Sequence, residues 1–228
     1  MQFEDARRRL ATLPTRLPSP PAELMPTLLS SPDAEPRFRT FPTGPLREAA
    51  VLILVHPSPS GEAQIILIER AGGDHIHAGQ VSLPGGGIEA GETPIEAALR
   101  EANEEVGLDP AQAGVTVVGE LPVSDVTVSG YRVHPVVAFA EREPVVAPDL
   151  VETVAVFTAP LGAFIPPAPI EIETADRDGY LLRYGGYRIG QYHVWGATAG
   201  ILGRLGVWLA QEDQLEAGDN EHEGQRPA

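Results

Sequence analysis

The stretch GGIEAGETPIEAALREANEEVGL, residues 86–108, decides the fold of this chain. The order Thr93, Pro94, Glu96 predicts a helix start, because the threonine hydroxyl can cap the glutamate amide while the glutamate reaches back and the proline fits the first turn. Gly107 is expected to end the helix, since glycine enters the left-handed cap conformation without a side-chain penalty. The apolar residues at helical spacing, which should pack inward, are Ile95, Leu99, Ala102 and Val106.

The same predicted helix carries Glu101, Glu104 and Glu105 on another face. Like charges four residues apart repel by roughly 0.2–0.5 kcal/mol, and carboxylates in the last turn oppose the helix dipole. Arg100, four residues from Glu96 and from Glu104, relieves only part of this repulsion. Because all-oxygen ligands suit Mg²⁺ or Mn²⁺, we interpret the excess charge as a divalent-cation site. A solvated acidic face is the alternative that the charges alone leave open.

The spacing of residues around this helix favours the cation site. Gly86 is followed after five residues by Glu92, and Glu92 after seven residues by Arg100. The run then continues as Glu101, Ala102, Asn103, Glu104, Glu105, Val106, Gly107 and Leu108. This pattern resembles the Nudix box at every fixed position, and the chain is similar to the Nudix hydrolases, which cleave a diphosphate linked to another moiety.

The resemblance implies roles for the residues of the box. Glu101 and Glu105 would be the central ligands of Mg²⁺ or Mn²⁺, and Glu104 a further direct or water-mediated one. The carbonyl of Gly85, directly before the box, would be a backbone ligand. Residues implied to brace the loop and orient the glutamates are Glu92 and Arg100.

Length and composition limit the class of protein. The 228 residues can bury one sizeable core, and the absence of cysteine excludes disulfides and thiolate metal sites. The net charge of −16 argues against a nucleic-acid partner, which requires a basic surface. The chain has no apolar run of about 18 residues, and its first ten lack the hydrophobic core of a signal peptide, so we expect a soluble cytoplasmic protein without a membrane partner.

The chain divides into three expected parts. Residues 1–46 should form a helix over 3–13 and a proline-rich extended arm, and residues 47–210 the Nudix domain. Residues 211–228 are acidic and poor in large apolar side chains, which predicts disorder. A homodimer is compatible with this organisation.

Within the domain, apolar runs predict strands that alternate with two main helices. This order indicates the α/β class, a mixed sheet sandwiched between helices, and it agrees with the Nudix fold that the resemblance implies. We expect 159–164 to be a loop or short helix and Gly185–Gly186 to be the turn of a hairpin between 180–183 and 187–194. A last helix over 196–210 should bury Ile201, Leu202, Leu205 and Leu209. The other predicted strands are 49–56, 63–70, 115–121, 131–140 and 153–158.

Two segments outside the box bear on the substrate. The run ILIERAGGDHIHAGQVSLPGG, residues 66–86, resembles the second motif of the coenzyme A diphosphatase branch, with Arg70, Ala71, Gly79, Pro84, Gly85 and Gly86 at its expected positions. Ile68, Leu83 and His75 depart from it; at His75 a permanently charged arginine becomes a histidine. The run WGATA, residues 195–199, resembles the helix start of the same branch.

The resemblance implies a substrate-binding set of Arg70, His75, His77, Gln80 and Gly86. Arg70 could instead be an ordinary surface ion-pairing residue. A zinc site on the two histidines is disfavoured, because they stand alone on a loop without thiolates.

The sequence therefore predicts a Mg²⁺- or Mn²⁺-dependent hydrolase of coenzyme A or its thioesters. The resemblance implies 3′,5′-ADP and 4′-phosphopantetheine, or its acylated form, as products. Glu152, directly before a predicted strand, is the candidate general base, although an ordinary strand-edge glutamate is an equal alternative. Two other hypotheses remain open. One is a Nudix hydrolase for ADP-ribose or a nucleoside triphosphate, and the other is a nonhydrolytic nucleotide-binding module.

Overall fold

A mixed sheet of eight strands forms the centre of the molecule. The computed structural model describes residues 1–29, 44–71, 79–126, 129–177 and 180–223. The strands of this large sheet are β2 (Arg47–Pro57), β3 (Ala63–Arg70), β4 (Val81–Ser82), β5 (Gly85–Gly87), β6 (Val115–Glu120), β7 (Ser124–Val126), β8 (Tyr131–Ala140) and β9 (Thr153–Pro160).

The path through the large sheet is β4-β3-β2-β8-β6, with β5 pairing with β2, β7 with β8 and β9 with β3. β2 and β8 run parallel, and their register places Val51 opposite Pro135. The other pairings are antiparallel. The end of β3 therefore lies beside the start of β9, where Arg70 is opposite Thr153.

Both faces of the large sheet are covered, which explains the continuous apolar run in β2. Ile53 and Val55 belong to one buried cluster, whereas Leu52 and Leu54 belong to a second cluster. Successive side chains of a strand point to opposite faces, so a strand buried on both faces is apolar throughout.

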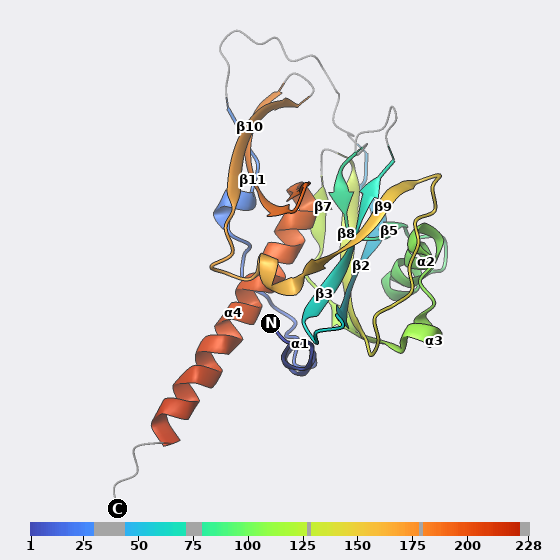
Figure 1. Cartoon of the computed structure of the whole chain (residues 1–228). Helices are drawn as coiled ribbons and strands as arrows, with labels where there is room; N and C mark the ends of the chain where they lie inside the picture. The colour runs from blue at the N-terminus through green and yellow to red at the C-terminus, as the bar shows by residue number, and fades with distance from the viewer. Residues whose placement is uncertain (30–43, 72–78, 127–128, 178–179, 224–228) are drawn as a thin grey trace, which may run out of the picture.

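Helices form the two outer layers (Figure 1). α2 (Pro94–Val106) and α3 (Pro110–Ala113) cover one face of the sheet, where Ala98, Ala102 and Val106 join the second cluster. The other cluster combines the large sheet with α1 (Phe3–Leu10), α4 (Gly196–Glu223) and the short 3₁₀ helices η1 (Ala22–Leu24) and η2 (Leu161–Phe164). This architecture confirms the expected α/β class.

A smaller sheet stands beside the large one, and here the predicted hairpin is wrong. β11 (Tyr180–Ile189) runs straight through Gly185–Gly186. A Cβ at Gly185 would collide with the Glu23 carbonyl oxygen, and one at Gly186 with the His193 ring. Glycine is therefore needed at these two positions because other parts of the chain approach the backbone closely there. The chain turns later, at Gly190 with φ +57°. The other strands of this sheet are β1 (Thr27–Leu28), β10 (Glu171–Arg177) and β12 (Tyr192–Trp195).

The ends of the chain differ in part from the expectation. α1 is helical as predicted, and Phe3, Ala6 and Leu10 are buried against the large sheet. α4 begins at Gly196 as predicted and buries the expected stripe, but it continues to Glu223 where disorder was expected. Residues 211–223 contain no proline or β-branched residue, and the helix continues through Gly218. In the described part of the chain, no helix combines the length and apolarity needed to cross a membrane.

Candidate functional site

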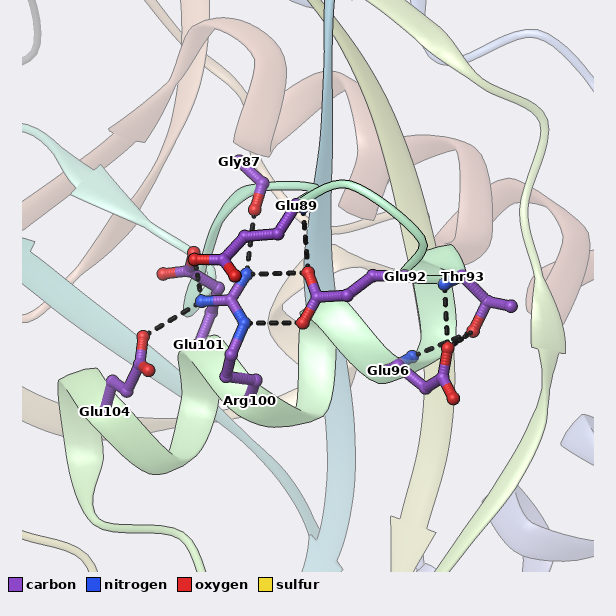
Figure 2. Close-up of polar contacts among 8 residues, drawn as sticks. All are labelled: Gly87, Glu89, Glu92, Thr93, Glu96, Arg100, Glu101 and Glu104. Atoms are coloured by element: carbon purple, nitrogen blue, oxygen red, sulfur yellow. Dashed lines mark hydrogen bonds and ion pairs between the residues drawn. The ribbon is translucent and has the colours of Figure 1, made fainter.

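The helix α2 is capped at both ends as the sequence predicted. The Thr93 hydroxyl accepts a hydrogen bond from the Glu96 amide at 3.3 Å, and the Thr93 amide donates to Glu96 Oε2 at 2.8 Å (Figure 2). Pro94 occupies the first turn, and Gly107 ends the helix with φ +66°. The caps fix where α2 begins and ends, and so they fix the direction in which its glutamates point.

The three glutamates in the second half of α2 do not share one face. The side chain of Glu105 is 3% exposed and that of Glu101 is 15% exposed, whereas that of Glu104 is 58% exposed. Glu101 and Glu105 are four residues apart and therefore stack on the side of α2 that faces the sheet. Glu104 lies at the rim of this pair.

Arg100 connects α2 to the loop before it. Its Nε donates to Glu92 Oε1 at 2.7 Å, and its Nη2 donates to Glu92 Oε2 at 3.0 Å and to the Gly87 carbonyl at 2.9 Å. Its Nη1 lies 2.9 Å from Glu101 Oε1 and 3.0 Å from Glu104 Oε2 (Figure 2). The bidentate bond from Arg100 holds the pKa of Glu92 below its usual value. Arg100 thus braces the loop and orients two acidic side chains.

Glycines 85 and 86 allow the loop to approach the two inner glutamates. A Cβ at Gly86 would lie 2.5 Å from the Glu101 carboxyl carbon, and a Cβ at Gly85 would collide with the Ala50 carbonyl oxygen. The Gly85 amide donates to Glu105 Oε2 at 2.8 Å in a buried hydrogen bond. Only residues without side chains permit this contact between β5 and α2.

Arg70 reaches the same glutamate from the end of β3. Its Nη1 lies 3.3 Å from Glu105 Oε1, and its side chain is 28% exposed. The Ala71 amide donates to the carbonyl of Glu152 at 2.8 Å, so the two strand ends are joined at this point. The negative charge of Glu152 also acts on Glu105. The structure therefore gathers Arg70, Glu105 and Glu152 from three separate elements.

Glu105 is a carboxylate whose charge the protein balances incompletely. Its pKa is raised to about 7, mainly by burial and to a smaller extent by the charges of Glu101 and Glu152. The Gly85 amide and Arg70 oppose this rise in the pKa without cancelling it. A buried carboxylate in this condition favours a cation beside it.

A loop and helix of this spacing, with two inward glutamates and a bracing arginine, are the features by which the family can be recognised. The model of the NUDIX domain matches residues 46–175. The chain is a Nudix hydrolase. Nudix hydrolases act on pyrophosphate bonds of nucleoside diphosphate derivatives. This chain therefore acts on compounds of that class.

The relatives of this Nudix hydrolase cover most of its length. It is 38% identical over 167 residues to the uncharacterized Nudix hydrolase NudL of Escherichia coli O7:K1, a match that spans 72% of this chain and 83% of the relative. It is 38% identical over 165 residues to Nudix hydrolase 15, mitochondrial, of Arabidopsis thaliana, spanning 68% of this chain and 56% of the relative. A crystal structure of the Nudix hydrolase RenU from M. smegmatis is 28% identical with a TM-score of 0.45, over 53% of this chain and 74% of that one.

Nudix hydrolases generally use divalent metals, and the donors on α2 fit such an ion. Glu101, Glu104 and Glu105 offer only carboxylate oxygens, which suit Mg²⁺ or Mn²⁺. Within the described residues no group of three acidic or histidine side chains has converged on one point. The carboxylates instead turn to Arg70 and Arg100. Arg70 leaves the buried charge of Glu105 incompletely balanced, so the chemistry of the donor set fits a divalent ion.

The remaining predicted site residues fall into two groups. The Gln80 carbonyl accepts a hydrogen bond from the Arg70 amide at 3.0 Å, which places Gln80 beside the site. His75 and His77 lie outside the described residues, and their substrate-binding role stays a prediction. The sequence did not indicate Gly87 or Glu89, which contribute a carbonyl to Arg100 and an amide to Glu92. Main-chain atoms make both contacts, so no side-chain pattern marks them.

Proposed function

We propose that this Nudix hydrolase cleaves the diphosphate of coenzyme A or its thioesters to 3′,5′-ADP and 4′-phosphopantetheine or its acylated form. The observation that carries the proposal is the contact between β4 and β12. β4 belongs to the motif at residues 66–86, and β12 leads into the run at residues 195–199. Both runs resemble the coenzyme A diphosphatase branch.

The two segments belong to one packed cluster, on the face of the large sheet opposite α2. Val81 and Leu83 from the first segment are buried together with Ala199 from the second and with Val194 and Leu202, which flank it. The chain reaches Gly85 two residues after Leu83, so the shared packing continues directly into the loop that contacts Glu105. Substrate-specific segments are expected to adjoin the reactive centre in this way, because one substrate must contact both.

The protein would hold a divalent cation between Glu101, Glu105 and Glu104, with the carbonyl of Gly85 as a further donor. When bound, a divalent ion would neutralise the charge of the diphosphate and lower the pKa of a coordinated water. Arg100 keeps Glu101 and Glu104 in place through its bonds to both. The Gly85 amide orients Glu105 by its hydrogen bond.

Arg70 would bind substrate phosphate in addition to holding Glu105. A guanidinium has five N–H donors, and the ion pair with Glu105 is made by Nη1. Gln80 and Gly86 lie next to Arg70 and Glu101 and would complete this part of the substrate site.

Glu152 would act as the general base that accepts a proton from the attacking water. Glu152 is exposed in the turn directly before β9, and its charge acts on Glu105. A base must be within reach of the water that it activates. The hydrogen bond from the Ala71 amide to the Glu152 carbonyl, next to Arg70, supports this role.

The proposal is tested by incubating the purified protein with Mg²⁺ and a panel of coenzyme A, acetyl-coenzyme A, ADP-ribose, NADH and dinucleoside polyphosphates, followed by chromatography of the products. The expected result is 3′,5′-ADP from the first two compounds. Turnover of ADP-ribose or NADH with intact coenzyme A would refute the proposed substrate while leaving the Nudix chemistry in place.

A further inference from the structure

A single turn over residues 150–152 lies between the last turn of α2 and the start of β9. Asp149, directly before this turn, is bonded to the backbone of the box. Its amide donates to the Glu105 carbonyl at 2.9 Å. The last carbonyls of a helix have no partner within the helix, so a bond from outside is the usual way to satisfy them. The turn therefore begins on the buried glutamate of α2.

The same turn ends on Glu152 and on β3. The Asp149 carbonyl accepts hydrogen bonds from the Glu152 amide at 3.2 Å and from the Thr153 amide at 2.8 Å. The Glu152 carbonyl in turn accepts from the Ala71 amide at 2.8 Å. A continuous path of backbone hydrogen bonds thus runs from Glu105 through Asp149 and Glu152 to the end of β3.

The side chain of Asp149 closes the turn. Its Oδ1 accepts a hydrogen bond from the Val151 amide at 3.1 Å. A short carboxylate that accepts an amide two residues later stabilises a turn in the same way as a helix N-cap. Asp149 therefore makes three bonds to the turn that it precedes, two through its carbonyl and one through its side chain.

The position of Glu152 depends on this turn. Glu152 is exposed, and its hydrogen bonds within the described residues are made by its backbone atoms. Its negative charge nevertheless acts on Glu105, so the two residues lie near each other. The backbone of the turn, rather than a contact of the Glu152 carboxylate, sets where that carboxylate begins.

We propose that Asp149 is a positioning residue of the reaction, which holds Glu152 at a fixed spacing from Glu105. The inference rests on the proposed role of Glu152 as the general base. A base transfers a proton only within hydrogen-bond reach of the attacking water, so a displacement of the base lowers the rate of the chemical step. Asp149 acts through Glu152 and takes no proton itself.

The chain offers a matched turn away from this path. Asp109 Oδ1 accepts hydrogen bonds from the Ala111 amide at 2.9 Å and the Gln112 amide at 3.0 Å at the start of α3. Asp109 is exposed, as Asp149 is, and α3 carries none of the residues assigned to the site. Asp109→Ala therefore removes the same kind of cap and reports the purely structural effect of that loss.

The test measures kcat and KM of the full chain with Mg²⁺ on whichever diphosphate of the panel the wild type cleaves. Asp149→Ala should lower kcat about tenfold and leave KM within about twofold, because the base is displaced while the substrate contacts remain. Asp149→Asn keeps an acceptor oxygen for the Val151 amide and should retain kcat within about twofold. Asp109→Ala should also retain it.

Two further measurements separate positioning from a general loss of structure. Glu152→Gln should lower kcat by about 10²–10⁴, the contribution of a general base. Adding Asp149→Ala to Glu152→Gln should lower kcat no further, whereas independent effects would multiply. Without substrate, the Val151 and Glu152 amides should exchange hydrogen faster in Asp149→Ala than in the wild type.

Each contrary result has a distinct meaning. Equal losses of kcat in Asp149→Ala and Asp109→Ala, or unchanged amide exchange in Asp149→Ala, would overturn the positioning role. A further tenfold loss in the double variant would show that Asp149 does not act through Glu152, which overturns it as well. Wild-type kcat in Glu152→Gln would refute the proposed base and the positioning role together. Loss of kcat in Glu152→Gln but not in Asp149→Ala would refute the positioning role alone.

Discussion

Arg70 Nη1 lies 3.3 Å from Glu105 Oε1, although 35 residues separate them in the chain. The contact joins the end of β3 to the buried side of α2. Among the described residues, Arg70 is the only arginine that contacts Glu105. The charge of Glu152, which follows closely after β3 in space, also acts on Glu105. The Nudix box is therefore completed by residues that lie outside it.

Arg70→Ala should affect two kinetic constants differently. Loss of the contact with Glu105 should lower kcat for coenzyme A and dephospho-coenzyme A alike. Loss of a phosphate-binding donor should raise KM for coenzyme A by roughly ten- to hundredfold, and less for dephospho-coenzyme A, which has no 3′-phosphate. Steady-state kinetics on both substrates measures this. Arg132→Ala is the control, because Arg132 forms an exposed pair with Asp125. A KM increase of equal size on both substrates would show that Arg70 holds the diphosphate, which both share, or the fold, and not the 3′-phosphate.

Gly86→Ala should displace the Glu101 carboxylate, because the new Cβ would lie 2.5 Å from its carboxyl carbon. A shift of about 1 Å in a reacting group costs on the order of a hundredfold in rate, and Glu101→Gln sets the scale for complete loss. The matched control is Gly87→Ala, whose Cβ would meet nothing within 4 Å. Turnover of coenzyme A measures the difference. An equal loss of turnover in the two alanine variants would show that Gly86 is not required for the close approach to Glu101.

Glu105→Gln should change how stability depends on pH. Burial raises the pKa of Glu105 from 4.5 to about 7 in the folded, metal-free protein. The folded state then holds this proton more tightly than the unfolded chain, so its stabilising effect is complete below the unfolded pKa and is lost as pH rises through 7. The wild type should lose on the order of 3 kcal/mol between these two pKa values, and Glu105→Gln should not show this loss.

Urea unfolding in a metal chelator between about pH 4.5 and 8 measures this difference in the free energy of unfolding. Glu104→Gln is the control, since the Glu104 side chain is 58% exposed and should retain the wild-type slope. If the free energy of unfolding depended on pH in the same way for the wild type and Glu105→Gln, the charge of Glu105 would not be incompletely balanced.

Deletion of residues 212–228 should leave activity and melting temperature essentially unchanged. Leu209 is the last residue of α4 that the structure describes as buried, and Gln211 is exposed. Circular dichroism should nevertheless show fewer helical residues. Truncation after Leu202, which also removes buried Leu205 and Trp208, should prevent stable folding by loss of core contacts. A large drop in melting temperature on the shorter deletion would show that the end of α4 packs on the domain.

Local patterns predicted α2 and most of the large sheet. The caps at Thr93 and Gly107 agree with the structure, and β3 and β8 have the predicted bounds. Each of these elements is determined by residues within it. The hairpin at Gly185–Gly186 was wrong, because the need for glycine there comes from Glu23, more than 150 residues earlier in the chain.

The same distinction holds for the site. The spacing within α2 was sufficient to indicate Glu101 and Glu105, but it did not separate them from exposed Glu104. That separation depends on where Gly85 approaches the helix. The contact of Arg70 with Glu105 depends on the pairing of β3 with β9, which no local pattern encodes.

The central claim is that the box of this Nudix hydrolase acts on coenzyme A. The most direct test is kcat/KM for coenzyme A and for ADP-ribose, measured with the same enzyme preparation in the same Mg²⁺ buffer. The account predicts that coenzyme A exceeds ADP-ribose by at least about tenfold, the effect of one charged contact to the 3′-phosphate. A value for ADP-ribose equal to or above that for coenzyme A would contradict it.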